Sequence, residues 1–427
     1  MTSDLQGANS QESKLATQRL YQDRNFRLFW LSRVLSGLGS AVTYVALPVL
    51  VYAETKSPLL VSLVAAGETM PYVFFGLLAG ALADHVNRRT MMVTADVLNA
   101  VCLGSIPLAA IFHALTPTHI VIAAFVSASL YIFFDAAGYG IVPSIVGQAR
   151  LPQANSAIWG AETTVRIVGT AMAGVLVAAL RPTGVIALDA VSFLASALLI
   201  RALTHSEQSS WNATGRLQLR ESVKEGVRFL WRQPELRIMT ISGCLQSFAG
   251  GAFIGQLVIF ADQGLGIAES DPRVGLLFTA WSVGGVLGSL MLPRLLRKAH
   301  AVQVMRMALP LSTVLGLLTA LTSDWRFALP AIAAWGTVYL MVIVNTVTFA
   351  QTVTPESLQG RVNTTRRMLS SGVGAPLGVM ISGLVTAAFT VRAGLLLAVA
   401  AVGFAAMAAW HPHLSSRGAE PQKVSSQ

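Results

Sequence analysis

The stretch GLLAGALADHVNRRTMM, residues 76–92, shows how this chain is organised. Two glycines four positions apart, Gly76 and Gly80, lie near the end of an apolar run, which stops at Asp84 and is followed by a pair of arginines. Small residues at this spacing let two membrane helices approach closely, and basic residues collect at the cytoplasmic ends of membrane spans. The stretch therefore predicts the inner end of a membrane helix, a short cytoplasmic turn and the start of a second helix.

The rest of the chain repeats this apolar pattern. Of its 427 residues, 54% are apolar and 12% are charged, which is about half the charged share of a soluble domain. Each apolar run has about 20 or more residues, enough for a helix to cross a bilayer, whereas strands of a membrane barrel would be short alternating segments. The first 25 residues are polar and lack the features of a signal peptide. We predict an all-α integral membrane protein with twelve spans, near residues 26–52, 58–83, 90–113, 118–147, 153–181, 183–204, 235–261, 273–296, 301–322, 325–353, 361–389 and 391–411.

The positions of lysine and arginine predict which side of the membrane each loop faces. If both termini are cytoplasmic, the outer loops hold few basic residues and two lie within spans, while all the others fall on the inner side. This asymmetry follows the positive-inside rule, so we expect both termini in the cytoplasm and the chain in the cell membrane. It also accounts for the net charge of +10 without nucleic acid as a partner. The exceptions are Lys56, Arg181, Arg273, Arg326 and Arg392 in outer loops, and Arg33 and Arg166 within spans.

The two halves of the chain are related by a repeat. Gly76 and Gly80 recur as Gly284 and Gly288, 208 residues later, and two glycines of span five recur in span eleven 209 residues later. Agreement on one offset predicts a duplicated six-helix unit, with the polar segment 205–234 between the copies. Helical spacing of its apolar residues predicts an amphipathic helix on the inner membrane surface. We expect an N-terminal tail (1–25), a six-helix bundle (26–204), a linker (205–234), a second bundle (235–411) and a C-terminal tail (412–427).

The stretch after span two resembles the signature loop of the major facilitator superfamily, with Gly80, Leu82, Ala83, Asp84, Arg88 and Arg89 at the matching positions. His85 and Asn87 depart mildly from the family pattern. The resemblance implies two six-helix bundles with a substrate path between them. It also implies a cytoplasmic latch of Gly76, Gly80, Asp84, Arg88 and Arg89, in which Arg88 positions Asp84 against a helix N-terminus of the other half.

A broader resemblance points to the branch of drug and siderophore exporters that includes macrolide-efflux transporters and the enterobactin exporter. It is carried by NFRLFWLSRVLSGLGS in span one, MPYVFFGLLAGALAD in span two and YIFFDAAGYGIVPSIV in span four. Some drug antiporters have an arginine in the middle of span four and a Gly-Pro pair in span five. Here Asp135 lies near the first position, and Gly169 and Thr170 occupy the second. The similarity is strong in the first half and diffuse in the second.

Ionisable residues inside the predicted spans are candidates for proton coupling, because such groups are costly in hydrocarbon and should face protein or water. Glu162 and Arg166 are four apart on one face of span five, where they can form a structural ion pair. Glu68 in span two and Asp135 in span four have no partner in their own helices. Since spans four and five are neighbours in the resembled fold, we hypothesise that Asp135, Arg166 and Glu162 exchange partners on protonation. Arg33 in span one completes this set.

Two further groups of polar residues carry expectations. Asp96, near the inner end of span three, is expected to contact Arg88 or Arg89. Spans seven to ten carry almost no buried charge, so their amide and aromatic side chains are expected to form a mostly apolar substrate wall. These substrate-cavity candidates are Gln246, Gln256, Trp281, Tyr339 and Asn345.

These patterns favour a secondary active transporter that uses proton coupling to export a hydrophobic or amphipathic small molecule. An importer or uncoupled facilitator has the same fold, and a membrane sensor that does not transport is a further alternative. The sequence contains no nucleophile elbow, Walker loop or histidine-rich metal cluster, which argues against an enzyme and against ATP-driven pumping. We expect no cofactor and no metal, the proton gradient as the energy source, a small molecule and the lipid bilayer as partners, and a monomer.

Overall fold

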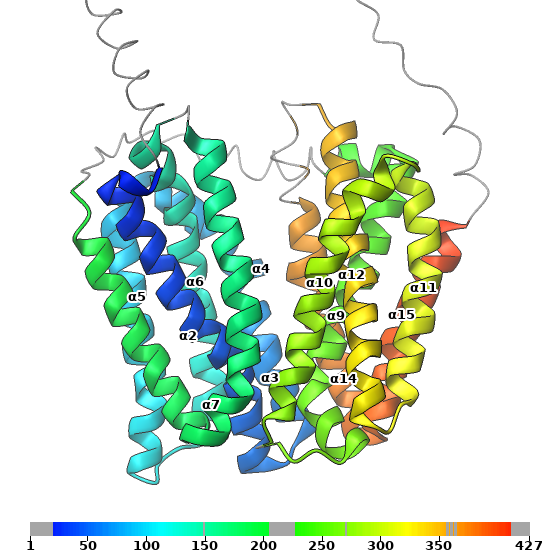
Figure 1. The fold of residues 1–427 in the computed structure, drawn as a ribbon, viewed down its shortest axis with the longest axis horizontal. Helices are drawn as coiled ribbons and strands as arrows, with labels where there is room; N and C mark the ends of the chain where they lie inside the picture. Colours follow the sequence, from blue (N-terminus) through cyan, green and yellow to red (C-terminus); the bar gives the residue numbers. More distant parts are fainter. Residues whose placement is uncertain are drawn as a thin grey trace, which may run out of the picture. The chain divides into compact units, whose positions relative to one another are not determined.

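The computed structural model describes residues 20–147, 150–204, 227–269, 271–355, 358, 362 and 365–410. Within these residues, every regular element is a helix (Figure 1). The elements are η1 (Leu20–Gln22), α2 (Arg24–Thr55), α3 (Pro58–Thr69), α4 (Pro71–His85), α5 (Arg88–Ile111), α6 (Pro117–Val146), α7 (Leu151–Arg201), α9 (Pro234–Ile259), η3 (Phe260–Gly264), α10 (Arg273–Leu296), α11 (Ala301–Leu321), α12 (Trp325–Val353), η4 (Met368–Gly374), α14 (Ala375–Ala388) and α15 (Val391–Ala409).

The described helices confirm the predicted membrane spans. Eleven of them are long and apolar enough to cross a bilayer. The longest, α7, has 51 residues and contains two spans, because Arg181 leaves the helical region at φ 60° and ψ 160° directly before Pro182. Span two is also interrupted: α3 ends at Thr69 and α4 restarts at Pro71, whose ring nitrogen has no hydrogen to donate. Counting both spans of α7, the described residues provide the twelve predicted spans.

Several helices begin at the polar residues that the sequence places between apolar runs. The Asp23 side chain accepts hydrogen bonds from two backbone amides at the start of α2, and Asn87 accepts one from Thr90 at the start of α5. Thr116 caps α6 in the same way. Such caps satisfy amides that have no partner within the helix, so the turn in the stretch 76–92 ends where the sequence predicts a new helix.

The chain divides by packing into two compact units, one formed by residues 1–215 and 255–282 and the other by residues 216–254 and 283–427. The segment 255–282, which by the repeat belongs to the second half, packs with the first unit. The predicted bundle boundaries follow the repeat, whereas these units follow contacts, and the predicted boundaries stay a proposal. Most of the predicted amphipathic helix lies outside the described residues. The described part of this segment, residues 227–232, is helical. The tails 1–19 and 411–427 also lie outside them.

The repeat is visible in how corresponding helices pack inside each unit. In the first unit, Gly169 on α7 lies against Leu38 and Ala41 on α2. In the second, Gly378 on α14 lies against the carbonyl oxygen of Phe248 on α9. Gly378 follows Gly169 by 209 residues, and Phe248 follows Leu38 by 210. Span five therefore packs on span one as span eleven packs on span seven, which supports duplication of a six-helix unit.

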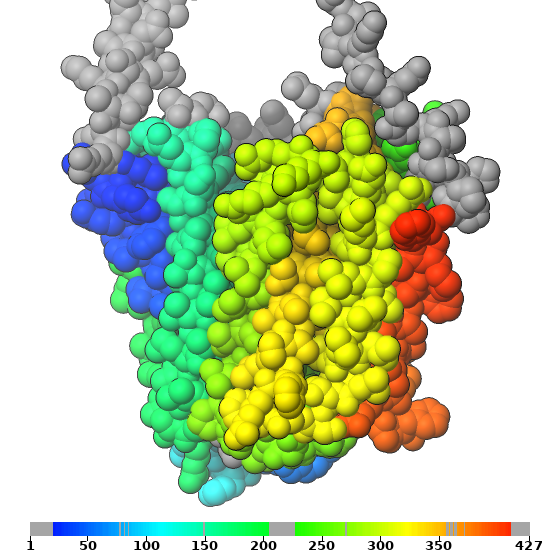
Figure 2. All heavy atoms as spheres, turned by 45° about the vertical axis from the view of Figure 1, so that its right-hand side comes forward, coloured from blue at the N-terminus to red at the C-terminus, as the bar shows by residue number. Residues whose placement is uncertain are grey.

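The outward face of α11 has the character expected of a surface in lipid. Met307, Leu311, Val314 and Leu318 recur at helical spacing and are all exposed. The opposite face of the helix, including Met305 and Leu309, lies in the core of the second unit. Figure 2 shows one face of the molecule. The yellow-green and yellow segments, which include α11 and α12, form part of this face. An exposed apolar stripe of this length on a helix that spans a bilayer faces hydrocarbon rather than water.

Candidate functional site

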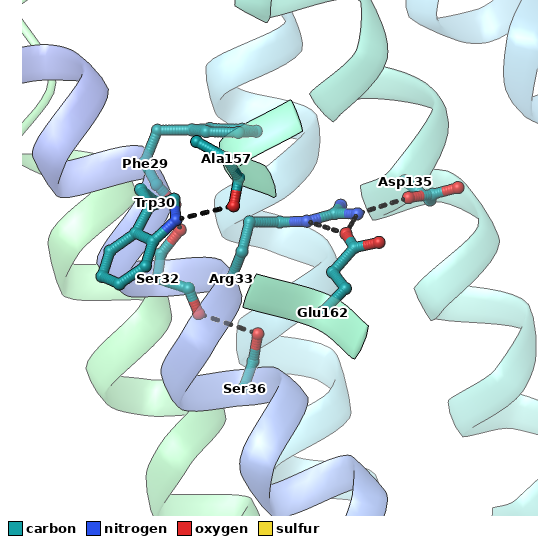
Figure 3. Close-up of polar contacts among 8 residues, drawn as sticks. All are labelled: Phe29, Trp30, Ser32, Arg33, Ser36, Asp135, Ala157 and Glu162. Carbon is teal, nitrogen blue, oxygen red and sulfur yellow. Dashed lines mark hydrogen bonds and ion pairs between the residues drawn. The ribbon is translucent and has the colours of Figure 1, made fainter. Parts of the chain in front are cut away.

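Three charged side chains from three different helices meet inside the first unit. Arg33 on α2 places Nη2 2.9 Å from Oδ1 of Asp135 on α6. The same guanidinium donates through Nε and Nη2 to Oε1 of Glu162 on α7 (Figure 3), with the Nε bond at 3.1 Å. The exposed fraction of the side chain is 7% for Arg33, 17% for Asp135 and 30% for Glu162. The arginine is thus enclosed, while both carboxylates keep access to open space.

Neighbouring residues make room for this arginine and fix its direction. A Cβ at Gly138 on α6 would lie 3.3 Å from Arg33 Nη1, so glycine leaves space for the guanidinium. The ring of Phe134, one turn earlier, lies 5.6 Å from Arg33 Cζ, within reach of a cation–π contact. Trp30 Nε1 donates to the carbonyl oxygen of Ala157 at 3.2 Å and ties α2 to α7 (Figure 3). The sequence thus places small and aromatic residues around one buried charge.

The cluster has one more negative charge than positive charge when both acids are ionised. Two carboxylates that share one cation in a low-dielectric site cannot both be fully compensated. One proton on either carboxylate makes the three side chains neutral as a set. Because Asp135 and Glu162 come from different helices, the position of the proton decides which helix the arginine holds more tightly.

Arg33 therefore takes the place that the sequence hypothesis gave to Arg166. Arg166 is exposed on α7 and forms no ion pair with Glu162 or Asp135. The expected contact between neighbours four apart in span five is wrong, because Glu162 turns toward Arg33 on α2 while Arg166 is exposed. Glu68 on α3 is half-buried. Among the described residues it has no hydrogen-bond or ion-pair partner, as the sequence predicted for its own helix.

Asp96 and Asp189 are two further acids buried in the first unit, each 1% exposed. Asp96 on α5 does not contact the arginine pair at the start of that helix. Arg88 donates to the carbonyl oxygen of Gly140 at 2.8 Å instead, and Arg89 donates to the carbonyl oxygen of Arg201, so the expected contact is wrong. Sequence reasoning missed Asp189. Its signal was an acid in an otherwise apolar span, followed at helical spacing by two serines.

The predicted cytoplasmic latch is described only in part. The side chain of Asp84 lies outside the description, so the predicted contact between Asp84 and Arg88 stays a proposal. A Cβ at Gly76 would lie 3.4 Å from the ring of Tyr72, and a Cβ at Gly80 would meet no atom within 4 Å. The close helix approach that the sequence predicts at Gly80 is absent among the described atoms.

The substrate-cavity candidates occupy two kinds of position. Gln246 donates to Ser312 Oγ at 3.1 Å, and Gln256 donates to Ser62 Oγ at 2.9 Å. Asn345 donates to the carbonyl oxygen of Ala301 at 2.8 Å. All three amides are fully buried, so in this structure they join helices rather than line open space. Trp281 and Tyr339 are half-buried, and their place in a cavity wall stays a prediction.

Within the first unit, the C-terminal end of α2 is bonded to the segment 255–282. Tyr52 Oη donates to Asp262 Oδ2 at 2.7 Å, and Lys56 Nζ lies 2.5 Å from Glu269 Oε1. The hydrogen bond from Lys56 lowers the pKa of the Glu269 carboxyl, which lies in the loop between spans. The first unit thus holds part of the second sequence half through polar contacts at the C-terminal end of α2.

Comparison with known proteins gives a consistent set of similarities. A family profile described as transmembrane secretion effector matches residues 16–427. The chain is 30% identical over 376 residues to the multidrug efflux pump Tap of Mycolicibacterium fortuitum, which covers 83% of this chain and 88% of the relative. It is 27% identical over 371 residues to the enterobactin exporter EntS of Shigella boydii, covering 82% of this chain and 84% of the relative.

Solved structures with the same fold are more distant in sequence. A bacterial homolog of the human lysosomal transporter Spinster, in an inward-facing and unoccupied conformation, has a TM-score of 0.76 at 12% identity. The match covers 92% of this chain and 97% of that chain. A mutant form of the nucleoside transporter NupG has a TM-score of 0.73 at 14% identity, and the match covers 90% of this chain and 98% of that chain. At these identities the likeness establishes the fold alone.

Proposed function

We propose that this chain, which belongs to the transmembrane secretion effector family of major facilitator transporters, is a proton-coupled exporter of a hydrophobic or amphipathic small molecule. The observation that carries the proposal is the buried guanidinium of Arg33, shared between Asp135 and Glu162. Its single excess negative charge gives the site a place for one proton. No enzymatic reaction is involved, because the family and the relatives are transporters.

The direction and the substrate class rest on the relatives and on the composition of the spans. The relatives named above are a multidrug efflux pump and a siderophore exporter. The half-buried aromatic side chains of Trp281 and Tyr339 are the remaining candidates for a mostly apolar cavity wall. A site of this composition suits a bulky substrate with a large apolar surface better than a sugar or a phosphate ester. We therefore propose efflux of a drug-like or siderophore-like molecule.

The proposed mechanism is alternating access driven by exchange of proton and substrate. With the carboxylates ionised, Arg33 holds α6 and α7 to α2. Protonation of Asp135 removes one of these two charge-assisted contacts and leaves the other. The contacts of Tyr52 and Lys56 with Asp262 and Glu269 join the outer end of α2 to a segment of the second half. In this mechanism they break when the outer side opens.

The proposed topology follows from the charge distribution. We place both termini and the linker in the cytoplasm, the two six-helix bundles at residues 26–204 and 235–411, and the chain in the membrane as a monomer. Labelling of a cysteine introduced at residue 215 by a membrane-impermeant reagent tests this placement. Residue 215 should react in inside-out vesicles and should be protected in intact cells.

The central experiment is transport in inside-out membrane vesicles. In these vesicles the lumen corresponds to the outside of the cell, so an exporter exchanging protons should concentrate a fluorescent amphipathic dye inside when the lumen is acidic. Asp135→Asn and Glu162→Gln should abolish this accumulation at matched protein levels. Glu54→Gln is the matched control, since Glu54 is an exposed acid at the outer end of α2.

Three results would replace the proposal. Dye movement that only equilibrates the two sides, and that is unchanged by a protonophore, would indicate an uncoupled facilitator. Gradient-driven loss of dye from the lumen would indicate an importer. Absence of movement for a panel of drugs and siderophores, by a protein that still binds one of them, would indicate a sensor.

A further inference from the structure

The first unit buries a second set of polar groups between α2, α5 and α7, separate from the ion pairs of Arg33. Thr43, Asn99 and Ser196 are each at most 5% exposed, and each carries side-chain atoms with no hydrogen-bond partner. Asp96 Oδ2 and Asp189 Oδ2 are also unpartnered. Buried polar atoms in native proteins are nearly always satisfied by protein or by ordered water. So many in one bundle indicate a hydrated site.

The carboxyl group of Asp189 is enclosed by α2 and by its own helix. Its Oδ1 accepts a hydrogen bond from Ser192 Oγ at 3.0 Å. A side chain at position 39 would overlap the carboxyl group, so Gly39 on α2 provides its space. Thr43, also on α2, interacts with the same carboxyl, although its Oγ1 forms no hydrogen bond of ordinary geometry. Asp189 Oδ2 and Thr43 Oγ1 thus both lack a well-formed hydrogen bond.

The second acid lies further along the same interface. Asp96 and Asn99 are three residues apart on α5 and so lie on one face. Ser196 on α7 interacts with Asp96, although its Oγ forms no hydrogen bond of ordinary geometry. Neither amide atom of Asn99 has a partner. Both donors and acceptors here thus lack hydrogen-bond partners, and bridging water molecules need both kinds of group.

The charges around this site do not compensate the acids. Asp96 and Asp189 face each other's charge. The other charged group near them is Arg33 on α2, which acts on Asp96 from a distance. Arg33 is already shared by Asp135 and Glu162. Asp189 precedes Ser196, the residue that faces Asp96, by seven positions on α7, or about 10 Å along the helix axis. Among the described residues, no group of three or more His, Cys, Asp or Glu side chains lies close enough together to hold a metal ion.

A row of small and polar residues on α2 runs between the two sites. Ser32, Ser36, Gly39 and Thr43 recur at helical spacing on α2, and their positions lie on one face of that helix. Both serines and Thr43 are buried. Ser36 Oγ donates to the carbonyl oxygen of Ser32, and Arg33 lies beside Ser32 on the same turn (Figure 3). Hydroxyl groups and bound water along this face can pass a proton between successive oxygens.

We propose that Asp189 is a second proton-binding residue, linked through buried water along α2 to Asp96 and to the Arg33 cluster. The step is a transfer of one proton: an O–H bond at Asp189 breaks, an O–H bond to the adjacent water forms, and the carboxylate left behind is reprotonated from the same water chain. The site extends the proton coupling proposed above and supplies a store of one proton inside the first unit.

Infrared difference spectroscopy of the purified full-length protein in liposomes tests this assignment without a substrate. A protonated carboxyl group gives a carbonyl stretching band that shifts in heavy water. The wild-type protein should show such a band at neutral pH, and it should be lost in Asp189→Asn and kept in Glu54→Gln. An unchanged spectrum in Asp189→Asn would show that Asp189 is ionised and would overturn the proposal.

Two further arms keep the test decisive. Spectra in sodium chloride and in choline chloride separate a proton from a metal ion: loss of the Asp189 band on adding sodium would mean that a cation occupies the site, which contradicts the proposal. If Asp189→Asn fails to fold, Thr43→Val removes the facing hydroxyl and should shift the band, and no shift would count against the assignment. Because no transport is measured, failure here leaves proton-driven efflux to be judged by the vesicle experiment.

Discussion

Arg33 Nη2 lies 2.9 Å from Asp135 Oδ1, although the two residues are 102 positions apart and belong to different helices. The same guanidinium donates to Glu162 on a third helix. One buried cation thus joins spans one, four and five of the first unit. The exposures of the acids, 17% and 30%, exceed that of the arginine at 7%. Protons can therefore reach the carboxylates while the arginine stays enclosed.

Replacement of Arg33 should affect both stability and transport. Arg33→Gln leaves two carboxylates without their cation, and loss of one partner of a buried pair costs about 3–5 kcal/mol. We expect a lower thermal midpoint in detergent and no gradient-driven transport. Arg33→Lys keeps the charge but not the planar fork that reaches both acids. It should restore much of the stability and little of the transport, and equal recovery of both would show that charge alone is required.

Replacement of Asp135 should separate proton coupling from folding. Asp135→Asn keeps the shape of the side chain and leaves Arg33 paired with Glu162, so the protein should fold and reach the membrane. Dye accumulation driven by an acidic lumen should fall to the level of vesicles without the transporter. Asp135→Glu restores an acid and should recover part of the activity. Undiminished proton-driven transport by Asp135→Asn would remove Asp135 from the coupling site.

Some features of the fold depend only on short segments of the sequence, and others depend on packing of the whole unit. The spans and the repeat could be predicted, because apolar length and glycine positions are properties of short segments. The partner of Glu162 could not. Spacing of four favoured Arg166, but the rotation of the helix about its axis decides which face meets α2, and that depends on packing of the whole unit. The sequence shows Asp189 as an acid in an apolar span. It does not show that the carboxyl group occupies the space that the missing side chain of Gly39 leaves.

Two glycines that belong to different matched pairs of the repeat, Gly378 and Gly80, should differ in how well they accept a methyl group. A Cβ at Gly378 would overlap the backbone oxygen of Phe248, which cannot rotate away. Gly378→Ala should therefore lower the free energy of unfolding by about 1–3 kcal/mol, as overpacking does. Gly80 has open space around its Cβ position. Gly80→Ala should leave the thermal midpoint unchanged or slightly raised, and equal losses for the two variants would contradict the described packing.

The pair of Lys56 and Glu269 should contribute a small stability that depends on pH. The hydrogen bond from Lys56 lowers the pKa of Glu269. A carboxyl whose folded pKa is depressed stabilises the fold above its unfolded value of about 4.3, and this stability is lost as the pH falls through the folded value. Since Lys56 is 55% exposed, the pair is worth at most about 1 kcal/mol and is weakened by salt.

A double-mutant cycle measures this pair directly. Lys56→Met and Glu269→Gln should each lower the thermal midpoint by a similar small amount at neutral pH, and the double variant should lower it no further. At a pH below the folded value of Glu269, the coupling between the two changes should vanish. Additive effects at neutral pH would mean that the two side chains do not interact in solution.

Ser312 provides a test of whether Gln246 serves packing or substrate. Ser312 Oγ accepts hydrogen bonds from Gln246 Nε2 and from Trp335 Nε1, each at 3.1 Å, and all three residues are at most 1% exposed. Ser312→Ala leaves two buried donors without an acceptor, and each costs about 1–3 kcal/mol. We expect a clear drop in the thermal midpoint, whereas Ser289→Ala, which removes only a bond within its own helix, should have little effect. If Gln246 instead faces substrate, Ser312→Ala should weaken dye binding while the midpoint stays the same, because freeing the amide would change the site and not the core.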